Sequence, residues 1–149
     1  MGNVETYLSS ELGLQDVLEF GFDNVAIATG STSRSDGVAR QHVVPMPIDD
    51  DMPVYTPDDL MAGRVPAGDV VLYDDDHYYM GGVLAELLVE AGATVTLVTP
   101  SAYVSDWTIN TLEQASIHKR LVDLGVTIRL NSGLQSIAGD HVVSDCIYT

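Results

Sequence analysis

The sequence predicts an α/β fold, with a parallel sheet flanked by helices and a small antiparallel β extension near the C-terminus. Val70–Tyr73 is a short apolar run, as expected of a parallel strand buried on both faces. Gly92 and a second apolar run at 95–98 follow a predicted helix. That helix is indicated by apolar residues at helical spacing: Met80, Val83, Leu84, Leu87, Leu88 and Ala91. Strand, helix and strand form the βαβ unit of a Rossmann-like fold.

The turn between this strand and this helix is acidic, whereas a dinucleotide-binding turn is rich in glycine. Residues 74–76 are all aspartate, His77 follows, and only Gly81 and Gly82 remain at the start of the helix. A phosphate would meet like charge at the positive end of the helix dipole. The acidic residue that holds a ribose hydroxyl, about 20 residues past the glycines, is also missing.

We therefore interpret the stretch as a Rossmann scaffold that does not bind a nucleotide at this turn. The alternative is an ordinary flavodoxin-like βαβ unit. In both cases the aspartates are expected to cap the helix.

Composition narrows the class of protein. A chain of 149 residues fits one domain, or one and a fraction, and 46% hydrophobic residues predict a globular protein. The net charge of −16 argues against nucleic acid and anionic membrane surfaces as partners. Cys146 is the only cysteine, which excludes an internal disulfide or a cysteine-held iron–sulfur cluster in this segment. It also indicates a reducing compartment, so we expect a cytoplasmic location.

The N-terminal part, residues 1–66, is predicted to be a separate segment with a linker, and residues 67–149 the Rossmann-like domain. The boundary is placed at 63–68. A strand at 24–28 ends in Ala28, Thr29 and Gly30. Such an ending recurs in two-dinucleotide flavoproteins, where the chain passes close to the flavin nucleotide, but it also fits any strand-to-loop turn. Other predicted elements here are a strand at 4–8, a helix at 15–20, a loop at 31–51, and a short helix capped by Thr56 with Pro57 in its first turn.

Beyond Pro100, a helix at 111–124 is predicted to begin at a capping box formed by Asn110 and Glu113. Trp107 is expected either to pack over the end of the sheet or to line an interface. The inward positions of the helix would be Leu112, Ile117, Leu121 and Leu124. Strands are expected at 126–130 and 133–137, and two antiparallel strands at 141–143 and 146–148.

No catalytic constellation and no metal-ligand spacing is visible in the sequence. His77 next to Asp75 or Asp76 could form a carboxylate–imidazole pair for acid–base work. However, adjacent turn residues rarely point at one reacting atom, so no catalytic residue is predicted.

The segment VVLYDDDHYYMGGVLAELLVEAGATVTLVTP, followed by VSDWTINTLEQ and RLVDLGV, resembles the C-terminal nucleotide-binding-type region of the trimethylamine dehydrogenase group. That group includes dimethylamine and histamine dehydrogenases and is related to Old Yellow Enzyme-like NADH:flavin oxidoreductases such as 2,4-dienoyl-CoA reductase. FDNVAIATGS and TPDDLM resemble the same region. The similarity extends over nearly the whole chain.

The resemblance implies a longer parent protein with an N-terminal (β/α)₈ barrel that carries FMN and a [4Fe–4S] cluster. Two domains like the FAD and NADPH domains of glutathione reductase would follow, and this chain would hold part of the first and most of the second. The implied partners are the missing barrel, the rest of the FAD-like domain, further copies in a homo-oligomer, and an electron-transfer flavoprotein. A retained ADP or FAD-type nucleotide would contact Ala28, Thr29 and Gly30, with Gly81 and Gly82 as the other candidate cofactor-binding residues.

Three functions are consistent with these observations. The first is a non-catalytic Rossmann-type fragment of a flavin- and iron–sulfur-dependent amine dehydrogenase. The second is an acidic module that docks a partner, with charge steering the approach. The third is an NAD(P)H-binding domain of an NADH:flavin oxidoreductase, against which the turn at 74–79 argues.

Overall fold

The computed structural model describes residues 3–149. The chain divides into two compact units, Met1–Ser31 and Thr32–Thr149. The boundary expected at residues 63–68 separates two domains of a longer parent protein, so it stays a prediction.

The first unit contains one helix, α1 (Leu14–Glu19), which confirms the helix predicted at 15–20. The Asp16 carboxylate accepts a hydrogen bond from the Gly13 N–H at 2.8 Å and so caps the helix start. The strands predicted at 4–8 and 24–28 are wrong, because both stretches have irregular backbone. A strand is stabilised by its neighbours, and neither stretch pairs with another strand among residues 3–149.

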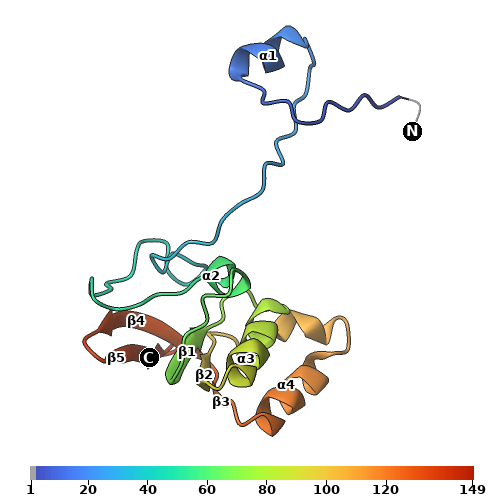
Figure 1. Ribbon diagram of the computed structural model, residues 1–149. Helices are drawn as coiled ribbons and strands as arrows, with labels where there is room; N and C mark the ends of the chain where they lie inside the picture. Colours follow the sequence, from blue (N-terminus) through green and yellow to red (C-terminus); the bar gives the residue numbers. More distant parts are fainter. Residues whose placement is uncertain (1–2) are drawn as a thin grey trace. The chain divides into compact units, whose positions relative to one another are not determined.

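The second unit is built on a parallel sheet of β1 (Asp69–Tyr73), β2 (Thr94–Val98) and β3 (Thr127–Arg129), in the order β1-β2-β3 (Figure 1). Helix α3 (Met80–Glu90) connects β1 to β2. The predicted βαβ unit is therefore confirmed, with the parallel pairing that a crossover helix permits.

Helices α3 and α4 (Gln114–Asp123) pack against one face of this sheet (Figure 1). Inward residues alternate along β2, so Val95 and Leu97 face the helices while Val98 faces the opposite side. None of the helices within residues 3–149 is long and apolar enough to cross a membrane. The buried residues on the helix side are Leu60, Leu84, Ala85, Leu88, Ala93, Val95, Leu97, Val104, Leu121 and Val126.

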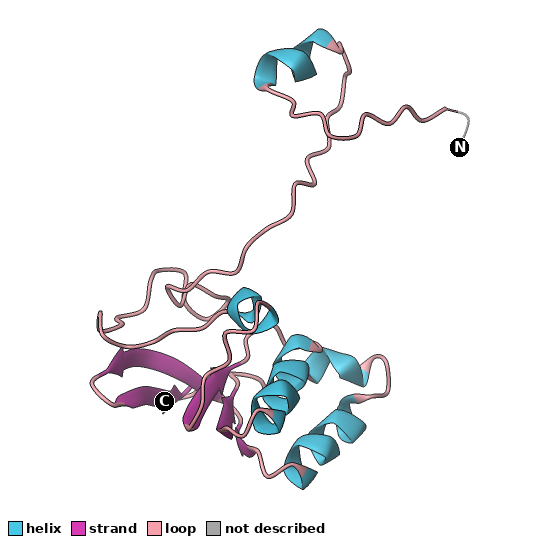
Figure 2. Cartoon of the chain, in the orientation of Figure 1, coloured by secondary structure: helices cyan, strands magenta, loops and turns pink. Residues whose placement is uncertain are grey.

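An antiparallel pair, β4 (Ser132–Ala138) and β5 (His141–Cys146), forms the predicted β extension (Figure 2). Leu134 of β4 packs with Val98 and Met46 in a second buried cluster. The α/β fold with its antiparallel extension is thus confirmed. The separate strand predicted at 146–148 is wrong: Cys146 is the last residue of β5 and pairs with Ser132, the first residue of β4. Beyond it, the Ile147 N–H donates to the Asn131 carbonyl at 2.9 Å, but the strand does not continue.

Helix α4 begins three residues later than the sequence predicts. Leu112 has a left-handed φ of 64° and is 90% exposed, so it interrupts the helix instead of packing inward. Glu113 is the N-cap residue, and no side-chain hydrogen bond caps the helix, so the expected capping box with Asn110 is wrong. By contrast, α2 (Pro57–Met61) has the predicted start: Thr56 and Asp59 form a reciprocal capping box.

The packing of α4 can be tested with a leucine substitution. Leu121→Ala is expected to lower the free energy of unfolding by about 2–5 kcal/mol, because Leu121 is fully buried between α4 and the sheet. Leu112→Ala serves as the matched control and is expected to change it by less than about 0.5 kcal/mol. Urea unfolding monitored by circular dichroism measures both. Equal losses from the two substitutions would contradict this assignment of the inward face.

Candidate functional site

Asp74 lies at the carboxyl end of β1 and is only 3% exposed. Its backbone N–H continues the sheet by donating to the Val98 carbonyl at 2.9 Å. Its Oδ1 accepts hydrogen bonds from the N–H groups of Asp76 and His77, at 3.2 and 3.3 Å, which closes the turn. The expectation that the aspartates cap α3 is wrong, because the N-cap residue is Tyr79, whose side chain makes no capping hydrogen bond, and Asp74 bonds to N–H groups of the turn instead.

The Asp74 carboxyl group lies against Gly81 in the first turn of α3. A Cβ at Gly81 would come within 2.4 Å of Asp74 Cγ and 2.6 Å of Oδ2, closer than real atoms approach. Because Gly81 has no side chain, the Asp74 carboxyl group can lie beside the start of the helix. In a nucleotide-binding turn, the equivalent glycines let the backbone approach a pyrophosphate.

Asp75 and His77 form the carboxylate–imidazole pair that the sequence suggested. Asp75 Oδ1 is 3.1 Å from His77 Nε2, and both side chains are largely buried. His77 has a left-handed φ of 65°, and its carbonyl accepts the Trp107 N–H at 2.9 Å. Trp107 belongs to the 3₁₀ helix η1 (Asp106–Ile109) and is half-exposed. It therefore lies at the end of the sheet, which is one of the two positions that the sequence led us to expect.

The loop that includes residues 37–46 is distant from this turn in the sequence but lies across it; we call it the crossing loop. The Gln41 N–H donates to Asp75 Oδ2 at 3.0 Å, and the Arg40 guanidinium lies 4.3 Å from the centre of the Trp107 ring, a cation–π contact. Met46 holds the far end of the loop in the second buried cluster. Gly37 allows this, because a Cβ there would lie 2.8 Å from the Met46 side chain.

Burial dominates the electrostatics of the turn. It raises the pKa of Asp74, against the opposing effect of the N–H groups of His77 and Asp76. The pKa of Tyr73 is also raised, first by burial and then by the nearby charges of Asp75 and Asp74. The site therefore disfavours additional negative charge.

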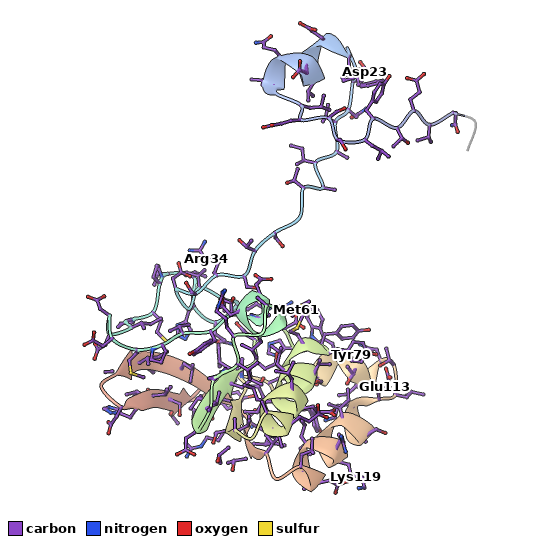
Figure 3. The ribbon with its side chains drawn as sticks, in the orientation of Figure 1. Asp23, Arg34, Met61, Tyr79, Glu113 and Lys119 are labelled. Atoms are coloured by element: carbon purple, nitrogen blue, oxygen red, sulfur yellow. The ribbon has the colours of Figure 1, made fainter. Side chains whose placement is uncertain are left out.

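A second contact ties the start of α3 to the start of α4. The Tyr79 hydroxyl donates to the Glu113 carboxylate, and both side chains are labelled in Figure 3. This hydrogen bond lowers the pKa of Glu113 and raises that of Tyr79. Arg120 of α4 also pairs with Glu86 of α3 at 3.1 Å. Two side-chain bridges thus connect the helices, one at their starts next to the acidic turn and one further along.

A cavity of about 1010 Å³ opens beside the turn. Its lining includes the whole of β1, the crossing loop, the start of α3 and parts of β4 and β5. The cavity extends along the whole of β1 and includes its carboxyl end, which is where ligands of parallel α/β sheets bind.

The candidate cofactor-binding residues belong to different units. Ala28, Thr29 and Gly30 are exposed, in irregular backbone of the first unit. Gly81 and Gly82 are buried at the start of α3 in the second unit, where Gly81 contacts Asp74. Contact of any of them with a nucleotide stays a prediction.

The arrangement of the turn does not fit a dinucleotide. Buried carboxylates, Asp74 and Asp75, stand where a pyrophosphate would need N–H donors and open glycines. Within residues 3–149, no three His, Cys, Asp or Glu side chains are grouped so as to hold a metal ion. Sequence reasoning did not identify Tyr73, Arg40 or Gln41 as part of the site, and no local pattern marks them.

Fold and site together define an α/β domain whose turn after the first strand is acidic and filled by the chain's own side chains. The chain belongs to the family described as the OYE-like second alpha/beta domain, whose model matches residues 55–142. This match covers more than half of the chain.

The chain is similar to three proteins whose names refer to amines. The chain is 31% identical over 133 residues to dimethylamine dehydrogenase of Hyphomicrobium sp. (strain x), covering 85% of this chain and 18% of that protein. The structure of histamine dehydrogenase from Rhizobium sp. 4-9 matches with 64% identity and a TM-score of 0.83, covering 99% of this chain and 23% of that one. The structure of 6-hydroxypseudooxynicotine amine oxidase from Pseudomonas geniculata N1 matches with 37% identity and a TM-score of 0.80, covering 99% of this chain and 22% of that one. The chain therefore spans about a fifth of the length of these relatives.

The close approach of Asp74 and Gly81 predicts unequal effects at two adjacent glycines. Gly81→Ala is expected to destabilise the chain by about 1–3 kcal/mol, because the new methyl group would overlap the Asp74 carboxyl group. Gly82→Ala is the control: its Cβ would meet the Ile117 side chain at 3.2 Å and Ser105 Oγ at 3.7 Å, without overlap, and alanine gains up to about 1 kcal/mol of helix propensity. Urea unfolding compares the two. Equal stability of the two variants would contradict the packing described.

The raised pKa of Asp74 predicts a pH-dependent stability. At a pH above the pKa of Asp74 in the folded chain, Asp74 is a buried charge, and this lowers the stability of the fold. As the pH falls towards 3.8, the ordinary pKa of an aspartate, Asp74 of the folded chain binds a proton before Asp74 of the unfolded chain does. The unsubstituted chain should therefore gain stability relative to Asp74→Asn across this window on acidification. Urea unfolding at pH 4 to 8 measures it. Asp76→Asn, an exposed substitution in the same turn, controls for net charge, and an equal pH dependence in both variants would contradict the prediction.

Proposed function

We propose that this chain is the second α/β domain of a flavin-dependent amine oxidoreductase, and that within it the domain has a structural role and does not bind NAD(P)H. The observation that carries the proposal is the buried Asp74 carboxyl group lying against Gly81, at the position where a dinucleotide-binding domain receives a pyrophosphate.

The names of the relatives support the amine branch. Dimethylamine dehydrogenase, histamine dehydrogenase and 6-hydroxypseudooxynicotine amine oxidase all act on amines by their names. The structures of the last two match nearly the whole chain, so the acidic turn belongs to the region of similarity.

The cofactors of such a parent would lie outside this chain. The resemblance to the trimethylamine dehydrogenase group implies FMN and a [4Fe–4S] cluster in a separate barrel, with electrons passing to an electron-transfer flavoprotein. Cys146 is the single cysteine of the chain and is exposed, so these residues alone do not supply the thiolates of a cluster. The isolated chain is therefore expected to be inactive. A homo-oligomeric parent and a cytoplasmic location belong to the same proposal.

A second candidate function is docking of a basic partner. The net charge of −16 favours it, because a strongly acidic surface accelerates the approach of a basic one. Association with such a partner should weaken steeply as salt rises.

The proposal predicts the outcome of titrating the chain with NADH, NADPH, ADP and FAD. Trp107 lies next to His77, with the Arg40 side chain over its ring, so its fluorescence reports on the turn, and amide shifts locate any contact. NADH and NADPH are expected to give no saturable change at millimolar concentration, because the buried carboxylates repel the pyrophosphate.

Saturable NADH binding with shifts centred on residues 74–82 would overturn the proposal and favour an NADH:flavin oxidoreductase. Binding of ADP alone, with shifts at Thr29 and Gly30, would be compatible with it and would locate a flavin-type nucleotide site. The double variant Asp74→Asn, Asp75→Asn separates charge from shape: if it gains NADH affinity, repulsion is what excludes the nucleotide.

A further inference from the structure

Strand β1 lies at the edge of the parallel sheet, because the order β1-β2-β3 gives it a single neighbour (Figure 1). Both of its faces are apolar: Val70 and Leu72 pack with the cluster on the helix side, and Tyr73 packs with the cluster on the opposite side. Edge strands are usually protected by a charged side chain, a proline or a bulge. Residues 70–73 contain no charge and no proline, so this edge has the composition of an interior strand.

The direction of the β1 backbone shows which of its main-chain groups are free. The Asp74 N–H donates to the Val98 carbonyl of β2 at 2.9 Å. Main-chain groups alternate in direction along a strand, so the even-numbered residues of β1 face β2. The N–H and C=O groups of Val71 and Tyr73 therefore point to the free edge, where no strand among residues 3–149 pairs with them.

The cavity of about 1010 Å³ follows this edge. Its lining includes all of β1 together with side chains from both buried clusters. Those on the helix side are Leu60, Leu84 and Leu88, and those on the opposite side are Met46 and Leu134. A space that reaches both faces of a sheet beside its last strand is the place that a further strand would occupy.

The backbone, and not charge, defines what fits this space. Arg40 and Arg129 line the cavity together with Asp69 and Asp140, so charges of both signs are present. What the lining offers along its length is the row of free N–H and C=O groups of β1. An extended peptide segment pairs with such a row, while its alternate side chains contact the two apolar clusters.

A second copy of this chain is disfavoured as the source of the segment. Its own β1 edge would lie in an equal cavity, so two folded copies would have to open both cavities before their edges met. A separate extended segment requires no such opening. The chain spans about a fifth of the length of its relatives, so a parent protein of that length has other residues to supply the segment.

We propose that the free edge of β1 is an interaction surface for an extended apolar segment of the parent protein outside this chain, which pairs with Val71 and Tyr73 as a fourth strand. The source of the segment rests on the proposed function, whereas the pairing at β1 depends only on residues of this chain.

The test is a titration of the full 149-residue chain with the acetylated and amidated heptapeptide KVTVTVK, followed by amide chemical shifts and hydrogen exchange. Main-chain hydrogen bonds give the affinity in strand addition, so a generic strand sequence serves as the probe. The expected result is saturable binding with shifts centred on residues 69–73. Exchange of the Val71 and Tyr73 N–H groups is expected to slow at least about tenfold, whereas that of Val70 and Leu72, which face β2, changes little.

The same heptapeptide N-methylated at its five central residues is the matched control. It has the same side chains and the same charge, but these residues cannot donate main-chain hydrogen bonds. It is expected to bind at least about tenfold more weakly, because two or more hydrogen bonds are lost. Equal affinity of the two peptides would mean that the lysine charges bind to the acidic chain, and would overturn the proposal.

A substitution in β1 tests the same groups from the side of the protein. Val71→Pro removes the N–H that faces the free edge and leaves the ladder to β2 intact. It is expected to weaken peptide binding about tenfold. Val71→Thr keeps the N–H and is expected to change affinity less than about threefold. If Val71→Pro fails to fold, the exchange pattern and the N-methylated peptide still decide the outcome.

Three further results would overturn the proposal. They are the absence of saturable shifts, equal protection of the Val70 and Val71 N–H groups on binding, and a dimer of the chain alone in which the Val71 N–H is protected. Sedimentation velocity detects the dimer, which would make a second copy the occupant of the edge. Since no measurement involves NADH, loss of peptide binding would leave the proposed function standing, and the two failures are distinguishable.

Discussion

The burial of the Asp74 carboxyl group at the β1–α3 turn is the constraint on which the rest of the second unit depends. One oxygen closes the turn through the N–H groups of Asp76 and His77, and the other lies against Gly81. The backbone of Asp74 meanwhile continues the sheet to Val98. One residue therefore sets the exit of β1, the path of the turn and the position of α3 over the sheet.

The same arrangement has an electrostatic cost that the surroundings only partly offset. Burial disfavours the charged form of Asp74, and the adjacent Asp75 adds a second buried carboxyl group. The positive end of the α3 dipole and the N–H groups of the turn oppose this cost. Gln41, brought over the turn by the crossing loop, supplies a further N–H to Asp75. An acidic turn of this kind is stable only when distant parts of the chain converge on it.

The elements predicted correctly from the sequence are those specified by local patterns. The apolar run of β1, the helical spacing of α3 and the Thr56 cap with Pro57 at the start of α2 each depend on a few neighbouring residues. The errors arise where distant contacts or backbone strain decide. Leu112 has helical periodicity, yet its left-handed φ delays the start of α4 until after this residue. Likewise, no local pattern indicates that Gln41 would bond to Asp75, because the two are 34 residues apart.

The acidic turn follows the same physical rule as a phosphate-binding turn, with a different anion. The start of a helix after a parallel strand attracts negative charge through its free N–H groups and its dipole. In a dinucleotide-binding domain the ligand supplies that charge and the glycines make room for it. Here Asp74 supplies it from within the chain, and Gly81 makes room for the carboxyl group. The start of this helix thus accommodates a carboxyl group of the chain itself, and this arrangement supports the proposal that the turn does not bind a nucleotide.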